Sequence, residues 1–241
     1  MSNIWMSCII LGNLCNVITI LFTPLCGIIF FGVYMIQTLA QSFNEMIKTY
    51  IRTFENFYPA RGSSGFTEAN QAHIFVNAII KCLDDEHAVS WLEFPWVEKK
   101  QRIDAFVFSP KHKAVFFIEA KRLSHTKKKQ EIIQDIERLH HKDKQFLRDN
   151  GVTDYASEYV VALSDVWLET KWKRSMPEWW CGRNNVPEQV IAHGSLTTPD
   201  STIHNSLVGI NWQQSTSFAY WIGEHCKNVQ NYCLLMAASK I

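Results

Sequence analysis

The sequence predicts an α/β domain that follows an N-terminal membrane-spanning helix. Runs rich in Val, Ile and Phe, typical of buried strands, alternate with amphipathic helical patterns, in the order helix, three strands, helix, strand. A long uncharged run at the N-terminus predicts the membrane helix. At 241 residues, the chain has room for one domain and an appendage.

The N-terminal run has no charged residue between positions 4 and 36, and the first basic residue is Lys48. Because about 20 apolar residues cross a bilayer as a helix, we expect one span at residues 15–36. A tight helical hairpin broken at Thr23-Pro24 and a buried globular helix are the alternatives. Basic residues follow the run and none precedes it, which predicts a cell-membrane protein whose C-terminal part faces the cytoplasm.

The elements after the span each have a local signal. Apolar residues at helical spacing predict a helix leaving the membrane, so that residues 1–58 form an anchor and juxtamembrane helix and residues 59–241 form the domain. Thr67 can cap a helix over residues 68–83. The remaining expected elements are strands at 88–94, 102–108, 115–121 and 159–163 and a charged amphipathic helix at 127–148.

Two of the expected strands are joined by the turn-like segment 109–113 and predict a hairpin. Folding about this turn brings Asp104 beside Glu119, and Glu119 and Lys121 share one face because side chains alternate along a strand. Buried charges are unfavourable unless they are paired or bind a metal ion. Two acids and a lysine around a divalent cation would meet this condition; the alternative is a surface hairpin with an Asp104–Lys121 ion pair.

Asp104 and the triplet Glu119-Ala120-Lys121 resemble the PD-(D/E)XK nuclease superfamily, whose signature is an aspartate on one strand and Glu-x-Lys on the next. Ile103 stands where the name-giving proline would be. The resemblance covers about residues 65–163 and implies a restriction-endonuclease-like mixed sheet flanked by helices. It also implies a nuclease that depends on Mg²⁺, or on Mn²⁺ in its place, with Asp104, Glu119 and the Ala120 carbonyl as metal ligands and Lys121 as a catalytic residue.

The same resemblance implies further site residues. Many members add a glutamate from the first helix, which matches Glu68, although an acid there also suits the helix dipole. Many also carry a glutamine on the following helix, where Gln134 is preferred over Gln130. Glu93 is a weaker candidate on the first strand. The lysines Lys127, Lys128 and Lys129 are candidates for phosphate contact, with a solvated helix start as the alternative.

The charge distribution suits a phosphate-bearing polymer. Residues 99–148 contain fourteen Lys or Arg against six Asp or Glu, although the whole chain carries a net charge of only +1. We therefore expect nucleic acid as the partner, with DNA favoured. A membrane anchor would restrict the enzyme to nucleic acid near the envelope, which is consistent with defence against foreign DNA. Tryptophans in 166–180 either stack bases or belong to the core.

Other classes of protein are disfavoured. Seven irregularly spaced cysteines argue against a disulfide framework and fit a reducing compartment. The spacing of Cys181, His193, His225 and Cys226 matches no common zinc site. Two rivals to the nuclease are a non-catalytic, membrane-tethered nucleic-acid-binding module on the same fold and an interaction protein whose hairpin is structural.

Overall fold

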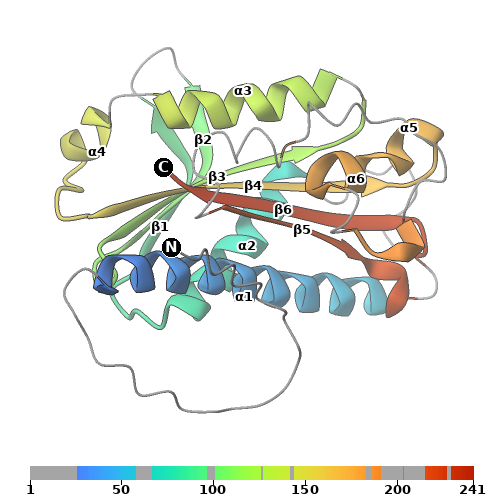
Figure 1. The fold of residues 1–241 in the computed structure, drawn as a ribbon, viewed down its shortest axis with the longest axis horizontal. Coiled ribbons are helices and arrows are strands. Elements are labelled where there is room, and N and C mark those ends of the chain that lie inside the picture. Colours follow the sequence, from blue (N-terminus) through green and yellow to red (C-terminus); the bar gives the residue numbers. More distant parts are fainter. Residues whose placement is uncertain are drawn as a thin grey trace, which may run out of the picture.

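The predicted α/β class is confirmed by a six-stranded mixed sheet with helices on both faces (Figure 1). The computed structural model describes residues 26–57, 67–96, 101–125, 127–141, 144–182, 186–190, 203, 215–226 and 229–241.

The sheet has the strand order β1-β2-β3-β4-β6-β5. The neighbours β3 and β4 are parallel, and the other neighbouring pairs are antiparallel. A parallel pair needs a crossover, and helix α3 lies between β3 and β4 in the chain. The strands are β1 (Val89–Trp96), β2 (Gln101–Ser109), β3 (Ala114–Arg122), β4 (Ser157–Trp167), β5 (Ser215–Trp221) and β6 (Tyr232–Lys240).

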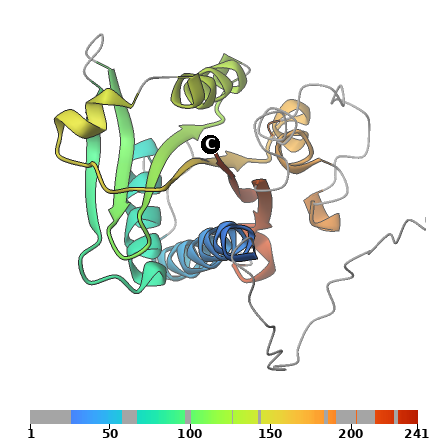
Figure 2. The same ribbon diagram turned by 60° about the vertical axis from the view of Figure 1, so that its left-hand side comes forward.

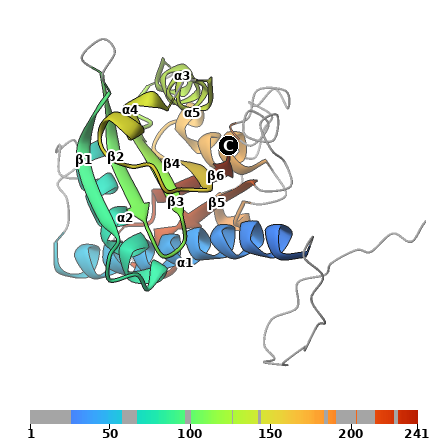
Figure 3. The ribbon, with the colours of Figure 1, turned by 90° about the vertical axis from the view of Figure 1, so that its left-hand side faces the viewer.

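Helices cover both faces of the sheet, and each face has its own apolar cluster (Figures 1 to 3). One cluster joins the sheet to α1 (Cys26–Asn56) and α2 (Glu68–Leu83). The other joins it to α3 (Lys127–His141), α4 (Gln145–Asp149), α5 (Lys171–Arg174) and α6 (Met176–Cys181). Two short 3-10 helices are Glu188–Val190 and Ile222–Glu224.

The predicted hairpin is formed by β2 and β3, with Ala105 opposite Ile118 and Ser109 opposite Ala114. Asp85 stabilises the turn, because its Oδ2 accepts hydrogen bonds from the Ser109 hydroxyl at 2.6 Å and the Lys111 N–H at 3.1 Å. The hairpin therefore has a buried acid as an anchor in addition to its turn composition.

Helix α2 has the predicted bounds. The Thr67 hydroxyl accepts a hydrogen bond from the Asn70 N–H at 3.3 Å, which confirms the cap. The expected helix 127–148 is instead divided into α3 and α4. Between them, Lys144 is buried and its ammonium donates to the Leu139 carbonyl near the end of α3.

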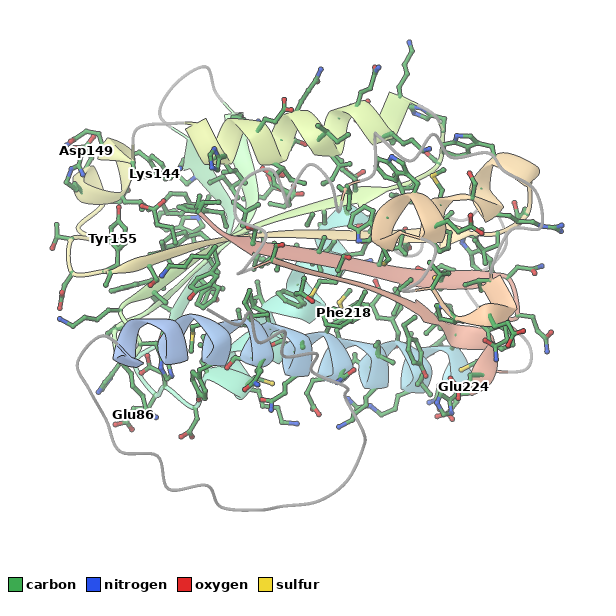
Figure 4. All side chains as sticks on the ribbon, in the orientation of Figure 1. Glu86, Lys144, Asp149, Tyr155, Phe218 and Glu224 are labelled. Carbon is green, nitrogen blue, oxygen red and sulfur yellow. The ribbon has the colours of Figure 1, made fainter. Side chains whose placement is uncertain are left out.

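Helix α1 begins inside the expected membrane span and continues without a break to Asn56. Its residues Met35, Leu39 and Met46 are fully buried, and Phe43 stacks on Phe218 of β5 with ring centroids 6.2 Å apart. Phe218 is labelled in Figure 4, between β5 and α1. The expected juxtamembrane helix therefore shares a hydrophobic core with the sheet, across the boundary expected after residue 58.

Half of the expected span, residues 15–25, lies outside the described residues. Among the helices that the structure describes, none combines the length and the apolar character needed to cross a bilayer.

Replacing a buried side chain of α1 tests whether this helix belongs to the folded domain. Met46→Ala should lower the free energy of unfolding by about 2–5 kcal/mol, because it leaves a cavity in the core. Chemical denaturation of the full-length chain measures the change. The matched control is Asn44→Ala, which alters an exposed position of the same helix. Equal denaturation midpoints for the two variants would show that α1 is dispensable for stability.

Candidate active site

The site begins where β2 and β3 separate. Their paired positions end with Ala105 opposite Ile118, and one residue further Asp104 turns its side chain toward β3. Its Oδ2 accepts a hydrogen bond from the Ala120 N–H at 2.7 Å. The carboxylate thus satisfies a backbone donor that the partner strand no longer reaches.

Glu119 lies next to Asp104 and is only 2% exposed. Burial raises its pKa well above the usual value, and the nearby charges of Asp104 and Asp135 add to this effect. Burial also raises the pKa of Asp104, against the opposing hydrogen bond from Ala120. Both carboxyl groups therefore hold their protons more tightly than in water, as expected for adjacent acids that are shielded from solvent.

Helix α3 supplies charged partners to Glu119 and Lys121 of β3. The Arg138 Nη2 donates to the Glu119 Oε1 at 2.5 Å and lies 3.3 Å from the Asp135 Oδ1. The Asp135 Oδ2 lies 2.9 Å from the Lys121 Nζ. Burial alone would lower the pKa of Lys121, but its hydrogen bond and attraction to Asp135 outweigh burial and raise it. Lys121 therefore stays protonated at neutral pH.

Glu68 joins the site from the opposite face of the sheet, at the first turn of α2. Its Oε1 accepts a hydrogen bond from the Arg122 N–H at 3.0 Å and lies 3.7 Å from the Lys128 Nζ. The start of α2, the end of β3 and the start of α3 are thereby brought together.

A cleft of about 450 Å³ opens at this junction. Its lining combines carboxylates from α2, β1 and β2 with cations from β3 and α3, so it offers both kinds of charge to a ligand. Glu93 lines the cleft as a third acid. It has a positive φ of 55°, and its carboxylate lies 3.7 Å from Arg102. The residues that line the cleft are Thr67, Glu68, Ala69, Glu93, Asp104, Arg122, Ser124 and Lys128.

Behind the cleft, Asp165 of β4 is fully buried. The Tyr232 hydroxyl donates to its Oδ2, and the Arg122 Nε lies 3.7 Å from its Oδ1. Burial raises the pKa of Asp165 to about 6, although Tyr232 and Arg122 oppose the shift. Tyr50 of α1 stacks on Tyr232 with ring centroids 6.3 Å apart. The buried acid thus connects α1 and β6 to Arg122 at the cleft.

The structure brings together four of the five expected catalytic residues, Glu68, Asp104, Glu119 and Lys121. The fifth, Gln134, is exposed on α3, as is Gln130. The α3 residues that reach β3 are instead Asp135 and Arg138, which the sequence analysis did not single out. Their signal was an oppositely charged pair three residues apart beside the buried stripe Ile132, Ile136 and Leu139.

The three candidate phosphate-binding lysines have different surroundings. Lys127 is exposed. Lys128 pairs with Glu131 at 2.8 Å as well as lying near Glu68. The Lys129 Nζ lies 4.7 Å from the centre of the Trp179 ring, and burial lowers its pKa. Trp179 is itself buried, which favours the core interpretation of this tryptophan.

Within the part that the structure describes, no three His, Cys, Asp or Glu residues lie close enough together to hold a metal ion. Cys181 and Cys226 are buried free thiols, and His193 lies outside the described residues.

Comparison of the chain with protein-family models, with curated proteins and with solved structures found no match.

The buried acid behind the cleft predicts a pH-dependent stability. In the unfolded chain the pKa of Asp165 returns to about 3.8, so the folded state binds the proton more tightly. This contribution is complete below pH 4 and is lost as the pH rises through 6. Relative to Asp165→Asn, the wild type should lose about 2.5 kcal/mol of unfolding free energy between pH 4 and 7.

Urea denaturation across this pH range measures the difference. The matched control is Asp154→Asn, because Asp154 is an exposed acid on the loop before β4. Parallel pH profiles for wild type and Asp165→Asn would show that Asp165 does not bind its proton in this way.

Proposed function

We propose that this protein is a metal-dependent nuclease with a restriction-endonuclease-like domain. The observation that carries the proposal is the convergence of Asp104, Glu119 and Lys121 at the point where β2 and β3 separate, with Glu68 arriving from α2. The strand positions and the order of elements support the resemblance found in the sequence.

The residues at this point suit a hard divalent cation. Mg²⁺ prefers oxygen ligands, is often held by only one or two carboxylates, and keeps several waters. Asp104, Glu119 and the Ala120 carbonyl would hold Mg²⁺ or Mn²⁺. Three acids, Asp104, Glu119 and Asp135, face two cations, Lys121 and Arg138, so the cluster has an excess of negative charge when ionised. A site of two carboxylates and a carbonyl needs no third carboxylate.

Each neighbouring side chain has a defined part in the proposed phosphodiester hydrolysis. A bound cation would neutralise charge on the phosphate and make its coordinated water more acidic. Lys121, which Asp135 keeps protonated, would stabilise negative charge in the transition state and is poorly suited to act as a base. Arg122 and Lys128, at the cleft, would attract the phosphate backbone. Glu68 adds a carboxylate and joins α2 to the site.

Nucleic acid is the proposed substrate, with DNA favoured. The basic excess of residues 99–148 includes Arg122 and Lys128 of the cleft. We further propose that the uncharged N-terminal run anchors the enzyme in the cell membrane with its domain toward the cytoplasm, where it would act against foreign DNA.

Cleavage assays on the purified chain test the proposed reaction. With Mg²⁺ or Mn²⁺, the wild type should cut DNA. Asp104→Asn should abolish cleavage and metal binding, because it removes a ligand. Lys121→Met should lower the rate on the order of 100-fold or more while metal binding remains, because lysine is not a ligand. Calorimetric Mn²⁺ titration accompanies the assay.

Glu137→Gln, an exposed position of α3 purified in the same way, controls for contaminating nucleases and for general effects of mutation on this helix. Wild-type rates in both Asp104→Asn and Lys121→Met would contradict the proposal. Binding of nucleic acid without metal binding or cleavage would support the non-catalytic module in its place.

The lysines of α3 predict a graded effect on nucleic-acid binding. Lys127→Ala should reduce the log–log salt slope on duplex DNA by about 0.9, because an exposed lysine can neutralise a phosphate. Lys129→Ala should change the slope less, since its ammonium lies over the Trp179 ring. Fluorescence anisotropy of labelled DNA at several salt concentrations measures both slopes. Equal slopes for wild type and Lys127→Ala would assign Lys127 to a solvated helix start.

A further inference from the structure

We infer that Asp135 and Arg138 are positioning residues, and that one turn of α3 holds Glu119 and Lys121 in place for the proposed reaction. The inference rests on the proposed nuclease function and adds to it two residues that no part of the signature contains.

The spacing on the two elements makes this arrangement possible. Glu119 and Lys121 are two residues apart on β3 and therefore point to the same side of the sheet. Asp135 and Arg138 are three residues apart on α3 and therefore share one helix face. Helix α3 packs on β3, so the two pairs face each other. The ion pairs form a continuous series: Glu119 contacts Arg138, Arg138 contacts Asp135, and Asp135 contacts Lys121.

The low solvent exposure of the four side chains strengthens these ion pairs. The side chains of Lys121 and Asp135 are each 17% exposed, that of Arg138 is 18% exposed and that of Glu119 is 2% exposed. Exposed ion pairs contribute little, whereas removing one partner of a buried pair leaves an uncompensated charge. The four groups are sheltered enough for each to constrain its partner.

Arg138 and Asp135 would act on different steps of the proposed reaction. Arg138 contacts Oε1 of Glu119, and such hydrogen bonds to a ligating carboxylate orient it for the metal. Asp135 contacts the ammonium of Lys121, whose four-carbon stem is otherwise flexible. Arg138 should therefore govern metal affinity, and Asp135 should govern the rate of the chemical step.

Two variants separate these roles. Arg138→Gln should weaken Mn²⁺ binding by about 10–100-fold, measured by calorimetry without nucleic acid. Asp135→Asn should weaken Mn²⁺ binding less than Arg138→Gln does but lower kcat by about 10–100-fold at constant KM, because misplacing a catalytic group slows the reaction. Arg138→Lys, which keeps the positive charge, should restore part of the metal affinity. Glu137→Gln, an exposed neighbour on the same helix, should behave as wild type.

A third measurement needs neither metal nor activity. In the metal-free protein, Arg138→Gln should lower the denaturation midpoint, and it should lower it less when Glu119→Gln is also present, because the charge of Glu119 that the contact can use is then already removed. Equal shifts in the two backgrounds would show that Arg138 does not stabilise Glu119, and this would overturn the inference.

The outcomes distinguish failure of the inference from failure of the proposed function. If the wild type binds Mn²⁺ and cuts, but folded Arg138→Gln and Asp135→Asn match it in affinity and kcat, the positioning role is wrong and the nuclease proposal stands. If the wild type neither binds Mn²⁺ nor cuts, the proposed function fails and the positioning role fails with it.

Discussion

The burial of two adjacent acids, Asp104 and Glu119, is the constraint on which the rest of the site depends. Burial makes it harder for either acid to lose its proton, although Asp104 is only half-buried, and each repels the other when ionised. The surrounding residues compensate for this. Ala120 donates its N–H to Asp104, and Arg138 donates to Glu119. The proposed metal ion would complete the same compensation, so stability and activity would share one electrostatic arrangement.

The sheet topology determines which residues can take part. Because β3 and β4 are parallel, α3 must cross over the sheet, and it runs over the end of β3 that carries Glu119 and Lys121. Helix α2 begins at the same end on the other face, so Glu68 can reach the Arg122 N–H. Asp165 on the neighbouring strand connects this end of the sheet to Tyr232 of β6. The proposed site is therefore supported from several elements at once.

Sequence reasoning found the parts of the site that depend on local patterns. Thr67 before an apolar stripe predicted α2, and two apolar runs about a short turn predicted the hairpin that places Asp104 near Glu119. It did not indicate that Gln134 lies exposed on α3, because a family pattern does not say which face of a partly amphipathic helix turns toward the sheet. It also missed β6, whose apolar run is buried on both faces and has no strand alternation.

The sequence by itself determined the α/β class, the hairpin and the acid–acid–lysine group, because these follow from alternation, turn composition and neighbours along the chain. Only the tertiary structure showed that α1 packs on the sheet. The sequence could not decide this, because a helix suited to lipid and a helix suited to a protein core have similar apolar sequence patterns. The tertiary structure also decided that Asp135 and Arg138 contact Lys121 and Glu119. Contacts between distant segments depend on how helices are placed over the sheet, and no local pattern specifies that placement.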